Sequence, residues 1–256
     1  MAGLAAIAET PVSVGDLHRS LIAALEAQAD PAWAKATGRF HKYEGFQCYG
    51  IRTSAWKALW SRFGSRFRRL SLDQRLSLAN ALLASGFEEQ AWVAIRLWAL
   101  SVDEMQATHF SHLDRGLDHF HSWSTTDGFC IDVLQPLLHQ YPQEILTLLR
   151  KWNRSENRWK RRASVVAFAR KVGASGQFVN DTLELCDNLI WDKEDLVQKG
   201  VGWALKDSMR GAKPKVLEYV KNLRRKGVPA TITLYAIRDL RGAEREAILV
   251  IHRERV

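Results

Sequence analysis

The sequence is poor in cysteine. Its three cysteines, Cys48, Cys130 and Cys186, lie far apart and form no Cys-x-x-Cys pair. A sparse, odd-numbered set fits a reducing cytoplasm and argues against both a disulfide framework and a zinc site. The histidines of "FSHLDRGLDHFH" (110–121) follow no regular metal-ligand spacing, so we expect them to be structural.

Long apolar runs are also absent, since no segment approaches the roughly 18 to 20 residues that span a bilayer. The first residues, "MAGLAAIAETPVSVG", are small and apolar but lack a basic region, which argues against a secretory signal. We expect residues 1–15 to form a poorly ordered tail. The protein should be cytoplasmic and have no membrane partner.

Proline and strand-like patterns are scarce. There are six prolines, and all except Pro136 fall between apolar periodic segments. Pro136 lies inside a helical pattern, which it should end or kink. No run of alternating β-branched residues compels a strand, and the nearest, "ATITLYAI" (230–237), is interpreted as helical. The sequence thus predicts an all-α fold.

Short amphipathic helices recur in pairs, and each pair takes about 35 to 45 residues. The pairs are "LDQRLSLANALLAS" with "FEEQAWVAIRLWALSV", "PQEILTLLRKWNRS" with "NRWKRRASVVAFARKV", "GQFVNDTLELCDNLIWD" with "EDLVQKGVGWALKDSMR", and "KPKVLEYVKNLRRK" with "PATITLYAIRDL". This period is typical of HEAT- or armadillo-type repeats, which stack into an α-α superhelix, or solenoid. We therefore predict one HEAT-like repeat domain over residues 1–256, with a globular helical bundle as the alternative.

Basic residues are concentrated in the second half of the chain. The net charge is +9, yet residues 1–149 hold 13 Lys and Arg against 15 Asp and Glu, whereas residues 150–256 hold 24 against 13. The second helix of each pair carries basic and aromatic residues beside its apolar stripe. In a solenoid these helices would line a concave basic groove, which suits a phosphate backbone. A generally basic, solvated surface is the alternative.

Four residues from different segments could form one reactive wall. Trp123 and Asp127 are four positions apart and would share a helix face. Together with Arg162 and Trp203 they would combine two indoles, a carboxylate and a guanidinium. Indole faces attract cations, a carboxylate stabilises positive charge, and an arginine binds phosphate through two parallel hydrogen bonds. Such a site would suit an alkylated purine in DNA, which is a cationic base on an anionic backbone.

Four segments of the sequence resemble the DNA alkylation repair family of AlkD-like HEAT-repeat glycosylases. They are "SWSTTD", "NRWKRRASVVAFAR", "DLVQKGVGWALKD" and, at 49–53, "YGIRT". The resemblance covers roughly residues 35–240. It implies removal of N3- and N7-alkylated purines from duplex DNA without flipping the base into a pocket.

By position, the resemblance assigns catalytic roles to Asp127, Trp123 and Trp203. It assigns phosphate binding to Arg162, and we add Lys199, Lys206 and Arg161 as further DNA-phosphate contacts. Because the positive charge of the lesion already activates the leaving base, no metal or organic cofactor is implied.

The sequence departs from the family pattern at two positions beside the acid. Ser124 replaces the usual Asp, and Gly128 follows Asp127 directly. The N-terminal aromatic contact could be Phe40, His41 or Tyr43.

Structural roles compete with these assignments. Trp123 and Trp203, like Trp92, Trp98 and Trp191, could fill a core or pack along the groove. Asp127 could be an N-terminal helix acid, with Thr125 or Thr126 as the cap. Arg162 and Lys199 could be solvated surface charges.

Three functions remain open at this point. The first is a monofunctional DNA glycosylase, expected to be a nucleoid-associated monomer. The second is a non-catalytic HEAT-repeat module that binds damaged or branched nucleic acid. The third is a protein–protein scaffold, for which DNA binding should be weak and insensitive to salt.

Overall fold

The computed structural model describes residues 13–41 and 45–251. Over these residues the chain is helical, and a single bridge between Gln47 and Phe87 is the one β-type contact. The all-α, solenoid-type fold is therefore confirmed, including the helical interpretation of 230–237. None of the helices in the described part is long and apolar enough to cross a membrane.

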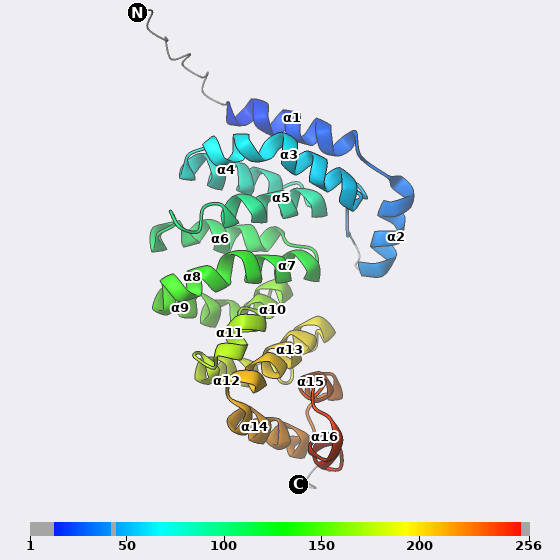
Figure 1. The fold of residues 1–256 in the computed structure, drawn as a ribbon, viewed down its shortest axis with the longest axis vertical. Coiled ribbons are helices and arrows are strands. Elements are labelled where there is room, and N and C mark those ends of the chain that lie inside the picture. Colours follow the sequence, from blue (N-terminus) through cyan, green and yellow to red (C-terminus); the bar gives the residue numbers. More distant parts are fainter. Residues whose placement is uncertain (1–12, 42–44, 252–256) are drawn as a thin grey trace, which may run out of the picture. The chain divides into compact units, whose positions relative to one another are not determined.

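The chain divides into two compact units between Glu104 and Met105. A repeat in a solenoid contacts only its neighbours, so such a division is compatible with one repeat array. The first unit contains α1 (Val14–Glu26), α2 (Pro31–His41), α3 (Thr53–Arg69), α4 (Leu72–Leu83) and α5 (Glu88–Ala99) (Figure 1).

The second unit carries the candidate site. It contains η1 (Ala107–His109), α6 (Phe110–Gly116), η2 (Leu117–His119), α7 (Trp123–Phe129), η3 (Cys130–Leu134), α8 (Gln135–Gln140), α9 (Pro142–Asn153), α10 (Arg158–Val166), α11 (Arg170–Ser175), α12 (Val179–Asp187), α13 (Asp195–Gly211), α14 (Lys213–Lys226), α15 (Ala230–Ala236) and α16 (Gly242–Leu249) (Figure 1).

Prolines and polar caps set many helix starts. Pro31 and Pro142 are the first residues of α2 and α9, where a missing backbone N–H costs nothing. Ser71 and Gln74 form a capping box at the start of α4. Ser13 caps α1, so residues 14 and 15 of the expected tail are helical, and residues 1–12 lie outside the described residues.

In the first unit, the chain turns at Gly50, within the "YGIRT" segment, before α3 begins. Gly50 has a φ of 78°, and a Cβ there would lie 2.4 Å from the carbonyl oxygen of Asp30, so glycine is required. The buried Glu89 carboxylate accepts hydrogen bonds from the backbone N–H groups of Tyr49, Gly50 and Ile51 at 2.9, 2.8 and 3.1 Å. This acid fixes the turn that precedes α3.

In the second unit, the helix does not end at Pro136, since residues 123–140 are helical throughout, with a π-helical turn before the proline. Residues 130–134 are π-helical, and the N–H of Gln135 bonds to the carbonyl of Cys130. Because Pro136 has no N–H, the wider turn accommodates the missing donor. The turn also directs the Gln135 side chain to the carbonyls of Ala167 and Ala169, at 3.2 and 2.8 Å.

Those two carbonyls mark a break that sequence reasoning missed. The segment "NRWKRRASVVAFARKV" was predicted as one helix, but α10 ends at Val166 and α11 starts at Arg170. The break is stabilised by tertiary contacts, namely Gln135 from α8 and Asp207 from α13, which accepts from the backbone N–H of Arg170 at 2.6 Å. Helical periodicity does not register such contacts.

Candidate functional site

Asp127 lies at the fifth position of α7, and its neighbours in sequence place it there. Ser122 is the N-cap, because its hydroxyl accepts from the backbone N–H of Thr125. The alternative in which Thr125 or Thr126 caps the helix is therefore wrong, and Asp127 is too far along α7 to be a first-turn acid. Trp123, at the helix start, is half-buried.

Asp127 is buried, and its partner is Arg162 of α10. The Nε and Nη2 atoms of Arg162 donate to the two carboxylate oxygens at 2.8 and 2.9 Å. Asp127 and Arg162 are only 9% and 5% exposed. This is a two-pronged, charge-assisted pair, and its geometry fits the ionised carboxylate, which accepts at both oxygens.

The pKa of Asp127 reflects opposing influences. Burial raises the pKa above its ordinary value, while the charge of Arg162, the hydrogen bonds from Arg162, and the charge of Arg170 act to lower it. The carboxylate is thus removed from water and depends on cations to stay charged. Such an anion is well suited to stabilise positive charge that develops beside it.

Two glycines of α13 set its distance from neighbouring helices. A Cβ on Gly200 would lie 3.3 Å from side-chain atoms of Val165 and Val166, and 3.5 Å from Arg162 Cγ. A Cβ on Gly202 would lie 2.6 Å from the Cβ of Tyr235 on α15. The "QKGVGWALKD" motif is therefore a packing surface of α13 against α10 and α15, and its half-buried Trp203 lies under the guanidinium of Arg170.

The four residues predicted to bind phosphate all contact acids in the structure. Arg162 binds Asp127 and also donates to the Leu196 carbonyl. Arg161 binds the carboxylate of Asp192 and the carbonyls of Ser155 and Glu156. Both guanidinium groups are thereby committed to holding protein segments, and their phosphate role stays a prediction.

The two lysines are less constrained. Lys199 pairs with Asp195 one turn earlier at 2.6 Å, and both side chains are largely exposed. Exposed pairs of this kind contribute little, so a phosphate can replace the carboxylate. Lys206 lies 3.0 Å from Asp207 and 3.5 Å from Asp239, with its side chain more buried.

Arg170 was not among the residues predicted from the sequence to form the site. Its side chain is exposed, and its Cζ lies 5.8 Å from the ring centroid of Trp203. Its backbone φ is 53°, a left-handed conformation that costs a non-glycine residue about 1–2 kcal/mol. No sequence signal marks Arg170, because it follows a helix break that tertiary contacts create.

Several aromatic predictions can now be placed. Trp98 is fully buried as expected, but Trp191 is 58% exposed and is therefore not core. Phe40 is 68% exposed, whereas His41 is buried and stacks on Phe46 at 4.4 Å between ring centroids. Tyr43 lies outside the described residues.

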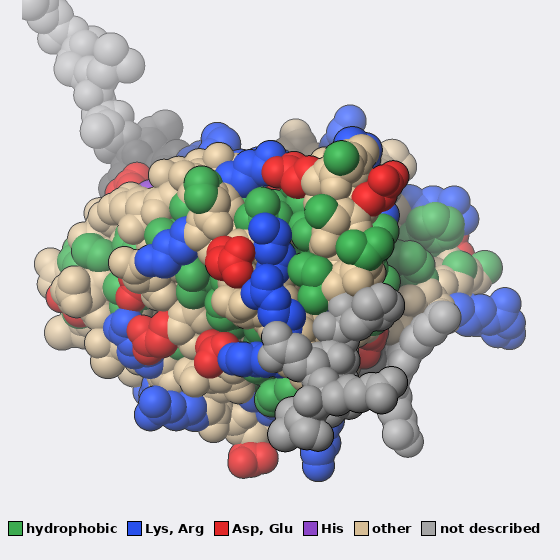
Figure 2. All heavy atoms as spheres, turned by 90° about the horizontal axis from the view of Figure 1, so that it is seen from below, with side chains coloured by type: hydrophobic (Ala, Val, Ile, Leu, Met, Phe, Trp, Pro, Cys, Tyr) green, Lys and Arg blue, Asp and Glu red, His purple; other side chains and the backbone are tan. Residues whose placement is uncertain are grey.

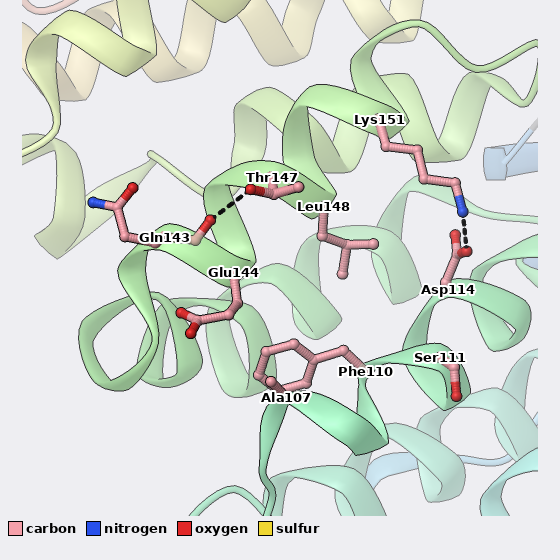
Figure 3. Close-up of a pocket in the computed structure, with 9 residues that line it drawn as sticks. All are labelled: Ala107, Phe110, Ser111, Asp114, Gln143, Glu144, Thr147, Leu148 and Lys151. Atoms are coloured by element: carbon pink, nitrogen blue, oxygen red, sulfur yellow. Dashed lines mark hydrogen bonds and ion pairs between the residues drawn. The ribbon is translucent and has the colours of Figure 1, made fainter.

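Among the described residues, hollows of the second unit include two that are not lined by Trp123, Asp127 or Trp203. One, of about 480 Å³, opens between α6 and α9, where Phe110 and Leu148 face each other and Lys151 pairs with Asp114 (Figure 3). The other, of about 270 Å³, is bordered by Lys206, Arg210 and Asp239. The wall around Asp127 is thus separate from both hollows.

Comparisons with known proteins identify the family. A structure described as a predicted DNA alkylation repair enzyme from Enterococcus faecalis is similar in fold, with a TM-score of 0.69 and 16% identity, over 84% of this chain and 98% of that chain. The search of curated proteins found no match. The model of the family described as DNA alkylation repair enzyme matches residues 21–240, and the chain therefore belongs to that family.

Proposed function

We propose that the protein is a monofunctional DNA glycosylase, which hydrolyses the N-glycosidic bond of N3- or N7-alkylated purines in duplex DNA. Membership of the DNA alkylation repair family supports a role in the repair of alkylated DNA. The observation that carries the finer proposal is the buried Asp127 carboxylate, held at both oxygens by Arg162 and placed four residues after a half-buried indole.

The chemistry follows from the charge of the lesion. Alkylation at N3 or N7 makes the purine cationic, so the base can leave with the electron pair of the glycosidic bond and become neutral. The sugar is left as an oxocarbenium ion, which the Asp127 carboxylate stabilises by Coulomb attraction. Water then attacks C1′, its proton passes to the carboxylate and on to solvent, and an abasic site remains.

Asp127 can act on the sugar while it stays paired. A carboxylate has about four lone-pair sites, and Arg162 occupies one on each oxygen. The others remain for the sugar cation or a water. Arg162 thus acts as a positioning residue, which keeps Asp127 charged and oriented.

The two indoles provide the walls of the site. Trp123 begins α7, the helix that carries Asp127, and Trp203 lies on α13, which packs against α10, the helix that carries Arg162. We propose that both pack on the sugar and backbone of the damaged nucleotide. In this arrangement the base stays in the duplex. Lys199 and Lys206 would add phosphate contacts.

The test is the release of free base from duplex oligonucleotides that contain N7-methylguanine or N3-methyladenine, measured by chromatography. Wild-type protein should release both, and it should not release an uncharged modified purine. In Asp127→Asn the rate of base release should fall by at least about 100-fold, as is typical when a preorganised charge that stabilises the transition state is removed.

Asp132→Asn is the matched control, because Asp132 is an exposed acid five residues along the same segment. It should release base at the wild-type rate. Absence of release by wild-type protein, with salt-dependent DNA binding retained, would refute the glycosylase and favour a binding module.

A further inference from the structure

Arg170 is an exposed cation that forms no salt bridge within the described residues, although its charge helps to lower the pKa of Asp127. Its guanidinium contacts the face of Trp203, and no carboxylate of the described residues pairs with it. Arg162, Arg161, Lys199 and Lys206, by contrast, are all in salt bridges. An exposed and unpaired guanidinium beside the proposed sugar-binding indole has five N–H donors available for an anion.

The backbone of Arg170 is fixed by two buried side chains. The peptide bond between Ala169 and Arg170 presents one carbonyl and one N–H. The carbonyl accepts from Gln135 Nε2 at 2.8 Å, and the N–H donates to Asp207 Oδ2 at 2.6 Å. Gln135 is 7% exposed and Asp207 is 1% exposed. A residue of α8 thus binds the carbonyl of this peptide, and a residue of α13 binds its N–H.

These contacts hold a conformation that arginine disfavours. Few non-glycine residues adopt φ near 53°, and such outliers persist only where surrounding contacts impose them. A glycine would adopt this backbone conformation without strain. The presence of arginine instead indicates that its side chain has a role at this position. The left-handed residue also turns the chain between α10 and α11.

We propose that Arg170 binds a DNA phosphate, namely the phosphate of the nucleotide that packs against Trp203. Asp207 and Gln135 hold the backbone of Arg170 in position for this contact. The proposal rests on the proposed function, because it takes duplex DNA as the ligand. It assigns to Arg170 the phosphate contact that sequence reasoning gave to Arg162. Asp207 acts as a positioning residue, since it contacts the backbone of Arg170 and lies one helical turn after Trp203.

The decisive variant is Arg170→Gly, because glycine suits the left-handed backbone while the guanidinium is lost. Its neighbour Lys171 is also exposed, so Lys171→Gln removes the same charge one residue away and serves as the matched control. Binding of an undamaged duplex would be followed by fluorescence anisotropy over a range of salt concentrations. Undamaged DNA keeps the measurement independent of base excision.

Arg170→Gly should weaken duplex binding about tenfold and reduce the slope of log affinity against log salt by about 0.9, the value expected for one lost phosphate contact. Lys171→Gln should leave both quantities close to wild type. Arg170→Gly should melt at or above the wild-type temperature, because the strain at this residue is relieved. Arg170→Asn should behave alike, since asparagine also tolerates a positive φ.

Wild-type affinity and slope in Arg170→Gly would overturn the proposal, as would equal losses in Lys171→Gln. If Arg170→Gly loses binding while wild-type protein releases no base, the phosphate contact stands and the glycosylase fails. If wild-type protein releases base and Arg170→Gly binds normally, the phosphate contact alone fails. Salt-insensitive wild-type binding would refute the phosphate contact.

Discussion

Asp127 and Arg162 form a pair in which each residue depends on the other. Burial of both charges is costly, and their mutual attraction with two hydrogen bonds offsets that cost. Removing one partner leaves the other charged, buried and unpaired. The effect of the pairing on the ionisation of Asp127 can therefore be tested by substituting Arg162, which leaves the carboxylate in place.

Arg162→Gln should shift the pH dependence of base excision toward alkaline pH. Burial already raises the pKa of Asp127, and Arg162 is the main influence that lowers it. Without the cation the pKa rises further, so less carboxylate is ionised at neutral pH. Activity should fall at pH 7 and recover as the pH increases. Initial rates of base release between about pH 5 and 9 would measure this.

The same variant should lower the free energy of unfolding by about 3–5 kcal/mol, as is typical when one partner of a buried pair is lost. Circular dichroism would verify that it remains folded at the assay temperature. Asp127→Asn should show no recovery at any pH, because it has no proton to lose. If the pH–rate profile of Arg162→Gln has the same acidic limb as that of the wild type, this account of the pair is contradicted.

At the scale of elements, irregularities place the site residues. The π-helical turn at 130–134 follows directly after α7 and directs Gln135 to the end of α10. Because the helix is broken at 167–169, the side chain of Arg170 can lie against Trp203 of α13. Glycines of α13 set how closely it approaches α10 and α15. The wall is therefore built from helix ends and close contacts between helices.

Gly202→Ala should destabilise the protein by about 1–3 kcal/mol, because the added methyl group overpacks the contact between α13 and α15. The new Cβ would lie 2.6 Å from the Cβ of Tyr235 and 2.9 Å from the Ile232 carbonyl oxygen, and backbone and inner side-chain atoms cannot easily move. Denaturant unfolding followed by circular dichroism measures the loss.

Gly64→Ala in α3 is the control for this prediction. A Cβ there would meet only the end of the flexible Arg68 side chain, at 3.7 Å. Alanine has the higher helix propensity, so this variant should be stabilised by up to about 1 kcal/mol. Destabilisation of both variants by similar amounts would mean that packing against α15 is not the cause.

For the whole molecule, the net charge is +9. Seen from the end that α14 and α16 form, Lys and Arg side chains are interspersed with acidic and apolar ones (Figure 2). On α14, Lys221 and Arg225 pair with Glu218, and Lys213 pairs with Glu244 of α16. Net charge alone therefore overstates the charge that DNA meets at the proposed site.

Duplex binding should depend on salt to an extent set by the few cations near Trp203, rather than by the whole net charge. With about four phosphate contacts, affinity should fall roughly 100-fold between about 50 and 200 mM salt. Titrations of wild-type protein at several salt concentrations measure this slope. Arg225→Gln on α14, remote in sequence from the site, should leave the slope unchanged. Salt-insensitive binding would instead favour a protein–protein scaffold.

The sequence alone determined most of the helices, and it supplied several residues of the proposed wall. Helical periodicity and prolines predicted the all-α fold, because amphipathic patterns and missing backbone donors act locally. The resemblance in "SWSTTD" and "VQKGVGWALKD" selected Trp123, Asp127 and Trp203 as the proposed site.

Only the tertiary structure decided what the charged residues contact. Arg162 looked like a phosphate ligand in sequence, yet it binds Asp127, which lies 35 residues away. Arg170 looked like an ordinary helical residue, yet Gln135 and Asp207 hold its peptide in a strained turn. Pairing and burial depend on contacts between distant segments, and these contacts leave no periodic signal in the sequence.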